Sequence, residues 1–376
     1  MIADRLGQEE EVVLTASSEL RQKDLDALLI YNPTAGPRDV RRELDRVIGY
    51  LERRGWQVAL RETTKTGDAT LFAQEAVTAR CKAVFVAGGD GTINEVVNGL
   101  VGSSVAMGVL PVGTGNVWAK ELGLPTYTLT HPGRLVEAAQ RLSDGDVRWV
   151  DVGKAGSRYF LLWGGVGIDA EVTFFLEPRP RRTKRLGALA YLVAGLMVAR
   201  DFQGVRTTVI VDDRTIRTRT ILILVSNIQL YGGLVRITPE ARLDDGLLDV
   251  RIFKGVGLRW VLRHVVGVFT SRHLRDPKVV HFRGRRVAVY TAEPAPVQVD
   301  GEPIGTTPIL FEVVPRALRV LVPRDVSPRL FCHGVDGQLA FATQATPPPR
   351  FPWLAERLTW VRELTGWFSD WRSLIP

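Results

Sequence analysis

The stretch that most constrains this chain runs from Val84 to Asn98, where an apolar segment leads through Gly88-Gly89-Asp90-Gly91-Thr92 into a helical pattern. Three glycines let the backbone approach a ligand closely, and N–H groups at a helix N-terminus favour phosphate. A carboxylate such as Asp90 beside a phosphate site is suited to handling Mg²⁺ or a proton. The stretch therefore predicts a strand–turn–helix unit that binds a nucleotide. The helix is predicted from apolar residues at the spacing of one face, namely Ile93, Val96, Val97 and Leu100.

Two further predicted strands end in turns of the same kind. The strand over 25–31 ends in Asn32-Pro33-Thr34-Ala35-Gly36, and the strand over 105–110 ends in a turn that contains Thr114. Strands alternating with helices predict a parallel α/β sheet, in which such strand ends gather on one ligand-binding edge. The helices are expected over about 38–54, 69–79 and 117–122, with another strand near 57–61 and Thr63 just after it.

From about residue 146 the pattern changes to strands with few long helices between them, which predicts a β-rich second domain. Two carboxylate-rich turns stand out there, at 243–249 and 299–303. Each alone is more commonly structural, but beside a phosphate edge the pair offers a metal ligand and a base. The GVGIDA stretch at 165–170 lacks the acidic residue that a dinucleotide motif needs about 20 positions later, and is interpreted as a structural turn. The predicted strands are 147–152, 159–163, 205–211, 215–225, 247–253 and 286–290.

Composition narrows the class of protein. A chain of 376 residues predicts two domains, with three as the alternative, and its net charge of +8 favours an anionic partner. The sequence contains no RNA-binding aromatic motif, zinc spacing or Walker sequence, which argues against nucleic acid. The longest apolar run, 186–199, is too short to span a bilayer, so a cytoplasmic protein is expected. The two cysteines do not make a disulfide framework. None of the histidines lies in a setting that suggests acyl-transfer chemistry.

Two segments leave membrane contact open. The basic run 179–185 precedes the apolar run and is either a solvated charged segment or a site that docks on anionic lipid. After a Pro-rich linker at 347–352, tryptophans recur at helical spacing in the tail. This tail suits an interfacial membrane helix, packing onto the body, or a homodimer contact. Its tryptophans are Trp353, Trp360, Trp367 and Trp371.

Together these motifs resemble the catalytic family of diacylglycerol kinases, and most closely the bacterial lipid kinases related to sphingosine kinases. The motif GGDGT alone is shared with NAD kinases and phosphofructokinases, but NPTAG upstream and DGEP downstream distinguish this family. The similarity covers roughly residues 24–325. The motifs in order are NPTAG (32–36), GGDGTINEVVNG (88–99), LPVGTGN (110–116), LDDGLLDV (243–250) and VDGEP (299–303).

The resemblance implies an α/β nucleotide-binding domain over 25–145, completed by about 316–330, and a β-sandwich-like lipid-substrate domain over 146–315. A polar leader (1–24) and the linker and tail (331–376) flank them. The implied activity is ATP- and Mg²⁺-dependent phosphorylation of a lipid hydroxyl, such as that of diacylglycerol, at a membrane surface. Alternatives are a sphingoid-base or phosphatidylglycerol kinase, an NAD kinase, or a catalytically silent lipid-binding regulator.

The resemblance also assigns roles to residues. Asp245 would hold Mg²⁺ with backbone carbonyls near Arg242 and Leu247, while Asp90 and Asp244 would lie in its water shell. Glu302 would accept the proton, with Asp300 beside it. Many members carry a carboxylate where Val117 stands here, so the metal shell would depend more on Asp90 and Asp244. ATP would be lined by Asn32, Pro33, Thr34, Ala35, Gly36, Thr63, Gly88, Gly89, Asp90, Gly91, Thr92, Ile93, Asn94 and Thr114.

Overall fold

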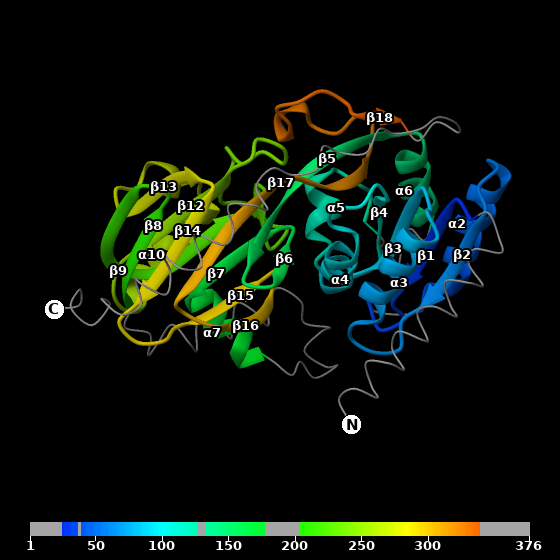
Figure 1. Ribbon diagram of the computed structural model, residues 1–376. Coiled ribbons are helices and arrows are strands. Elements are labelled where there is room, and N and C mark those ends of the chain that lie inside the picture. The colour runs from blue at the N-terminus through cyan, green and yellow to red at the C-terminus, as the bar shows by residue number, and fades with distance from the viewer. Residues whose placement is uncertain (1–24, 37–38, 127–132, 177–203, 339–376) are drawn as a thin grey trace, which may run out of the picture. The chain divides into compact units, whose positions relative to one another are not determined.

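The computed structural model describes residues 25–36, 39–126, 133–176 and 204–338 (Figure 1). All of them belong to one compact unit. The polar leader 1–24, the basic and apolar runs over 179–199 and the tail 347–376 lie outside the described residues. Among the described helices, none has the length and hydropathy that crossing a membrane requires.

The N-terminal half is built on adjacent parallel strands in the order β2–β1–β3–β4–β17. Every residue of β1, β3 and β4 is buried, which is typical of a parallel sheet covered on both faces. Leu29 of β1 lies opposite both Leu60 and Phe85, so the three neighbouring strands end at the same level. The strands are β1 (Ala27–Tyr31), β2 (Val58–Glu62), β3 (Ala83–Gly88), β4 (Ala106–Pro111) and β17 (Ile309–Val322).

Helices connect these strands and pack through one apolar face. In α2, Leu44, Val47 and Leu51 recur every three or four residues and are buried. The short-range pattern predicted the first three helices and α5, whereas α6 went unpredicted. The helices are α2 (Arg41–Arg53), α3 (Asp68–Thr78), α4 (Asp90–Leu100), α5 (Val117–Glu121) and α6 (Arg134–Ser143).

The second half consists mainly of antiparallel strands that share one apolar core. Phe160 and Phe311 meet there edge to face, with ring centroids 6.1 Å apart. Its strands are β5 (Asp146–Ala155), β6 (Arg158–Phe160), β7 (Trp163–Gly167), β8 (Val205–Val211), β9 (Arg214–Ser226), β10 (Leu230–Tyr231), β11 (Val235–Arg236), β12 (Leu248–Lys254), β13 (Val279–Gly284), β14 (Arg286–Thr291), β15 (Pro296–Val299), β16 (Glu302–Thr306) and β18 (Gly337–Gln338). Its helices are α7 (Ile168–Leu176), α10 (Leu258–Phe269) and the 3₁₀ turns η1 (Arg272–Arg275) and η2 (Pro328–Leu330).

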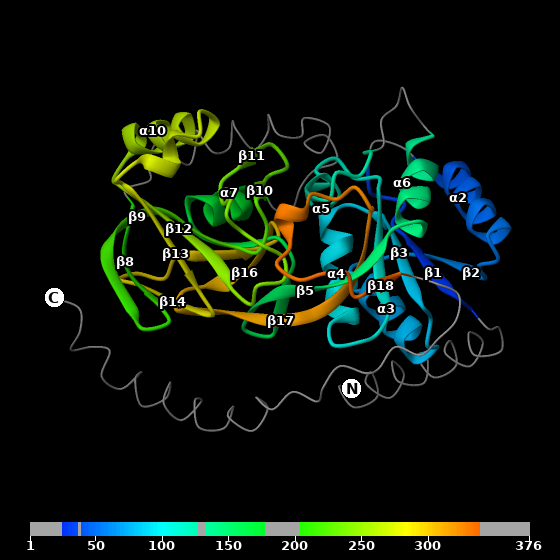
Figure 2. The ribbon, with the colours of Figure 1, turned by 90° about the horizontal axis from the view of Figure 1, so that it is seen from above.

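Strand β17 belongs to both halves. Its first residues pair with β14, while Arg319 and Val320 pair in parallel with Ala106 and Met107 of β4. Between these two parts the register shifts, and Arg316 adopts a left-handed φ of 47°. Figures 1 and 2 show β17 and β5 side by side along this path. The chain thus returns to the N-terminal parallel strands through the end of β17.

Candidate active site

Three glycine-containing turns meet at the carboxyl edge of the first sheet. Asn32, after β1, donates from Nδ2 to Oγ1 of Thr92 in α4 at 2.9 Å. A Cβ on Gly36 would lie 2.1 Å from the carbonyl oxygen of Val112, which follows β4. Likewise, a Cβ on Gly113 would lie 2.6 Å from the Cα of Gly89. Since only glycine permits these approaches, the backbones of the three turns form one continuous edge.

The GGDGT motif is mostly the first turn of a helix. β3 ends at Gly88 and α4 begins at Asp90, so only the extended Gly89 lies between them. The N–H groups of a first helical turn have no partner within the helix and carry the positive end of its dipole. The structure therefore aims the start of α4 at the edge formed by the three turns, an arrangement suited to phosphate.

Asp90 is held by the neighbouring turn. Its Oδ1 accepts a hydrogen bond from the backbone N–H of Val117 at 2.8 Å. Burial raises the pKa of Asp90 from 3.8 to about 6, and the negative charge of Asp300 adds to the rise, while the Val117 and Trp118 N–H groups oppose it. Val117, which stands where the family often has a carboxylate, thus contacts Asp90 through its backbone N–H, and its side chain is buried.

Asp300 is a fully engaged carboxylate. It accepts hydrogen bonds from the backbone N–H groups of Leu161, Leu162 and Trp163 and from Nδ2 of Asn94, at 2.8–3.0 Å. These donors come from β6–β7 and from α4, so one side chain joins the β15–β16 turn to both halves. Burial raises the pKa of Asp300 even though all four hydrogen bonds favour the charged form.

Glu302 lies two residues further along the same turn but in different surroundings. Its side chain is about one-third exposed and forms an ion pair with Arg158. A Cβ on Gly91 would lie 3.2 Å from its Oε1, so this carboxylate sits against the first turn of α4. Arg158 also donates to Oδ1 of Asn94, from Nε at 3.2 Å and Nη2 at 3.0 Å. Glu302 is therefore placed directly beside the predicted phosphate site.

A second network supports the same turn from behind. Asp169 of α7 accepts hydrogen bonds from Tyr231 and from Nε2 of Gln298, and Oε1 of Gln298 accepts from the N–H of Gly301 at 2.8 Å. Asp169 belongs to the GVGIDA stretch, which was predicted to be a structural turn. In the structure β7 leads straight into α7 there. The φ of Gly167 lies in the left-handed region, and a Cβ at this position would lie 2.5 Å from the Ile221 carbonyl oxygen.

The structure places Asp244 and Asp245 in a different group of carboxylates. Asp244 is buried and accepts from the N–H groups of Cys332 at 2.5 Å and His333 at 2.9 Å. Asp245 forms an ion pair with Arg283, and its Oδ1 accepts from the Leu247 N–H at 3.1 Å. The charges that act on the pKa of Asp90 include Asp300, whereas Asp244 and Asp245 act on that of Asp151.

Asp151 is the residue that organises this second group. It is fully buried in β5 and accepts from the N–H groups of Gly246 at 2.6 Å and Arg316 at 2.7 Å. Burial raises its pKa from 3.8 to about 6. Its side chain thereby ties the Asp244-Asp245-Gly246 turn to the irregular part of β17.

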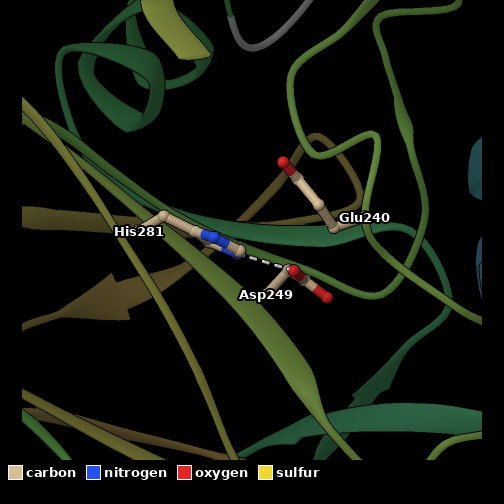
Figure 3. A group of neighbouring side chains, drawn as sticks. All are labelled: Glu240, Asp249 and His281. Carbon is tan, nitrogen blue, oxygen red and sulfur yellow. Dashed lines mark hydrogen bonds and ion pairs between the residues drawn. The ribbon is translucent and has the colours of Figure 1, made fainter. Parts of the chain in front are cut away.

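A third cluster contains side chains that commonly bind metals, namely Glu240, Asp249 and His281 (Figure 3). Nε2 of His281 and Oδ1 of Asp249 lie 2.7 Å apart. Two arginines already neutralise the carboxylates, because Arg251 pairs with Glu240 at 2.6 Å and Arg283 with Asp249 at 3.4 Å. This arrangement is an ion-pair network across β12 and β13.

The remaining residues predicted to line ATP lie along the same edge. Thr34 and Thr114 are exposed there, and Thr34 donates from N and Oγ1 to Oδ1 of Asn32. Thr63 is buried, and its N–H donates to the Tyr31 carbonyl at 2.8 Å. The structure thus brings the predicted nucleotide residues together with Asp90, Asp300 and Glu302.

Sequence patterns alone did not identify Arg158, Asp151 or Glu121. Glu121 of α5 is buried and accepts from the N–H groups of Gln229 and Leu230, both at 3.0 Å. Asp151 carried a usable signal, since it interrupts the apolar sequence of a strand. Arg158 carried none, because its partners come from distant parts of the chain.

Comparison with known proteins agrees with this geometry. Residues 26–155 match the model of the diacylglycerol kinase catalytic domain, and residues 165–322 match that of the YegS C-terminal NAD kinase beta sandwich-like domain. A diacylglycerol kinase of Bacillus subtilis is 31% identical over 306 residues, which cover 81% of this chain and 98% of that protein. The chain belongs to the diacylglycerol kinase family. It is therefore a lipid kinase, a phosphotransferase with an alcohol group as acceptor.

Two further relatives have the same extent. A diacylglycerol kinase of Staphylococcus carnosus is 31% identical over 303 residues, covering 80% of this kinase and 96% of the relative. A crystal structure of a putative diacylglycerol kinase from Bacillus anthracis str. Sterne matches with a TM-score of 0.67 and 25% identity, covering 80% of this kinase and 98% of that chain. The predicted fold, an N-terminal parallel-sheet α/β region followed by a β-sandwich-like domain, is confirmed.

Proposed function

We propose that this kinase transfers the γ-phosphoryl group of ATP to a hydroxyl of diacylglycerol or a closely related lipid at a membrane surface, with Mg²⁺. The observation that carries the proposal is the position of Glu302. Its carboxylate lies against Gly91 at the start of α4, so a proton acceptor stands beside the N–H groups that suit a phosphate. The names of the relatives support diacylglycerol as the acceptor.

In this proposal the edge of the first sheet holds ATP and the second half supplies the base. Backbone N–H groups of the glycine turns and of α4 would bind the phosphates, which positions the γ-phosphorus for in-line attack. Glu302 would take the proton of the lipid hydroxyl as the new O–P bond forms and the bond to the ADP oxygen breaks. Arg158 holds the Glu302 carboxylate in place through their ion pair.

Asp300 has a different role in the proposal. Because its four hydrogen bonds occupy both carboxylate oxygens, it would position Glu302 and Asn94 rather than accept the substrate proton. Asp90 would remain at the phosphate edge, where the family resemblance places it in the water shell of Mg²⁺.

The turn over 242–247 fits Mg²⁺ through the chemistry of its donors. The Asp245 carboxylate and the backbone carbonyls near Arg242 and Leu247 are hard oxygen ligands. Burial raises the pKa of Asp245, the ion pair with Arg283 opposes the rise and the nearby charge of Asp249 adds to it, so a bound cation would replace Arg283 as the partner of this carboxylate. A bound ion would neutralise charge on the ATP phosphates. Asp244 would support this turn indirectly, because its carboxylate accepts hydrogen bonds from the backbone N–H groups of residues 332 and 333.

The proposal is tested with labelled ATP and a panel of diacylglycerol, sphingosine, phosphatidylglycerol and NAD. Label is expected in diacylglycerol. The Glu302→Gln variant should lose about 10²–10⁴-fold in turnover, the usual contribution of a general base, with an unchanged unfolding midpoint. The control is Glu293→Gln, an exposed glutamate on the turn before β15, which should retain full turnover. Wild-type turnover in Glu302→Gln would contradict the assignment.

A further inference from the structure

Helix α10 presents two apolar faces, and the described residues pack against only one of them. Val261 packs against Ile221 of β9 in a small core that also contains Ile168 and Val172 of α7. His264 is buried beside it, and its Nε2 lies 2.9 Å from the Lys254 carbonyl oxygen. This inward face accounts for how α10 is attached to the protein.

The other apolar face is exposed within the part of the chain that the structure describes. Phe269 is 63% exposed, Val266 58% and Leu262 43%, and Leu258 and Val265 are exposed as well. At about 100° per residue, these five side chains fall within an arc of about 100° on one side of the helix. We call them the α10 apolar stripe. A contiguous exposed apolar surface of this kind marks an interaction site.

Basic residues accompany the α10 apolar stripe, since Arg259 follows Val266 directly around the helix and η1, which contacts α10, carries Arg272 and Arg275. Over 258–278 the sequence has five lysines and arginines and a single acidic residue, Asp276. That aspartate already pairs with Arg263 at 2.9 Å, so the segment keeps an excess of positive charge. The basic residues are Arg259, Arg263, Arg272, Arg275 and Lys278.

This surface is connected to the phosphate edge. His273 of η1 is buried between the carbonyl oxygens of Gly267 at 3.3 Å and Ile237 at 3.1 Å, which fixes α10 to the segment after β11. The β10–β11 hairpin lies beside α10 (Figure 2) and contacts it. Leu234, in the turn of this hairpin, is exposed. A Cβ on the adjacent Gly233 would lie 3.0 Å from Nζ of Lys120 and 3.4 Å from the Gly115 carbonyl oxygen, in the turn after β4.

We propose that the α10 apolar stripe docks on the surface of an anionic lipid bilayer and orients the kinase toward its substrate. The proposal rests on the proposed lipid-kinase function. A bilayer surface satisfies both halves of the pattern, because acyl chains accept the apolar side chains and anionic headgroups attract the bordering cations. A second copy fits less well, since a two-fold contact would bring the same basic border against itself.

The apolar part is tested by co-sedimentation of the full-length protein with vesicles that contain phosphatidylglycerol. The double variant Leu262→Ser/Phe269→Ser should bind about tenfold or more weakly, because two exposed apolar side chains no longer enter the bilayer. The matched control is Leu71→Ser on α3, a leucine 37% exposed, which should bind as the wild type does.

The electrostatic part is tested with Arg259→Gln/Arg272→Gln. Loss of two charges at the surface should weaken binding to anionic vesicles by roughly tenfold and reduce its salt dependence. Arg42→Gln/Arg46→Gln on the exposed side of α2 removes the same charge elsewhere and serves as control. Equal binding of wild type to purely neutral phosphatidylcholine vesicles would overturn the electrostatic half.

Two readouts separate this proposal from its alternatives and from the proposed function. Phosphorylation of a dispersed short-chain diacylglycerol should be unchanged in Leu262→Ser/Phe269→Ser, whereas phosphorylation in vesicles should fall. Absence of any kinase activity would leave the vesicle-binding result decisive on its own. Unchanged vesicle binding in this variant would overturn the proposal, and so would a dimer-to-monomer change on size exclusion without loss of binding. Equal hydrogen exchange of α10 with and without vesicles, as expected if residues 341–376 cover it, would also overturn it.

Discussion

The two sides of the candidate active site differ in what they are made of. The carboxyl edge of the first sheet is formed by backbone, where Gly36 and Gly113 allow neighbouring turns to touch. The β15–β16 turn opposite is formed by side chains, where Asp300 gathers donors that lie more than 130 positions earlier in the chain. The sheet edge depends on the absence of side chains at its glycines. The β15–β16 turn depends on a buried carboxylate whose oxygens are all hydrogen-bonded.

This difference teaches how substitution should act on each side. Adding atoms should damage the edge, because a new Cβ would meet a neighbouring backbone. Removing charge should damage the turn, because a buried donor that loses its acceptor pays its full desolvation cost. Asp300 and Glu302 sharpen the contrast within one turn, since the first is buried with four donors and the second is partly exposed with one arginine.

The largest effect on stability is expected for Asp300→Asn. The amide would face three backbone N–H groups and Nδ2 of Asn94 with only one acceptor oxygen, which should cost about 3–5 kcal/mol of the free energy of unfolding. Urea unfolding measures this. The exposed Asp213→Asn, in the β8–β9 turn, is the control and should change stability by about 0.5 kcal/mol at most. Full stability with abolished turnover would instead assign the proton transfer to Asp300 and break the contrast.

A smaller loss is expected for Gly36→Ala. Its left-handed φ of 79° and the approach to the Val112 carbonyl oxygen should together cost about 2–3 kcal/mol and raise the KM for ATP. Gly102 has a similar φ of 81° but an open surrounding, so Gly102→Ala isolates the conformational part, about 1 kcal/mol, and should leave KM unchanged. Equal KM values in the two variants would show that the turn contact does not shape the nucleotide site.

The last effect concerns the pH dependence of stability and is confined to a narrow pH range. Because the pKa of Asp90 is raised from 3.8 to about 6, the folded protein binds its proton more tightly than the unfolded chain does. The contribution of Asp90 to the free energy of unfolding should therefore decrease as pH rises from about 4 to about 6 and should level off above that. Asp90→Asn should make the slope shallower without removing it, since Asp151 has the same shift. An identical slope in the variant, from urea midpoints across this range, would contradict the raised pKa.

The fold and the nucleotide edge were largely predictable because their causes are local. Strand ends followed by Gly, Thr and Asn turns specify a parallel sheet edge without reference to distant residues, as in the GGDGT stretch. The metal and base residues came from the family resemblance, and the structure places Glu302 beside that edge.

The rest depended on tertiary pairing that local patterns cannot express. Arg158 acquires its role only when β6 lies beside α4, and Asp151 only when β17 returns. Helix α10 went unpredicted because apolar residues occupy both its packed and its exposed face, which hides the usual polar alternation. Asp244 and Asp245 likewise come close to Asp151 only in the folded protein, because about a hundred residues separate them in the sequence.

Strand β17 has a consequence for synthesis. The chain leaves the ribosome from its N-terminus, so β4 emerges more than 200 residues before Arg319 and Val320, its partners on the other side. During that interval β4 is an open apolar edge of an incomplete sheet, a known starting point for wrong association. Completion of the N-terminal parallel strands therefore waits for β17 to be made, after most of the antiparallel strands of the second half.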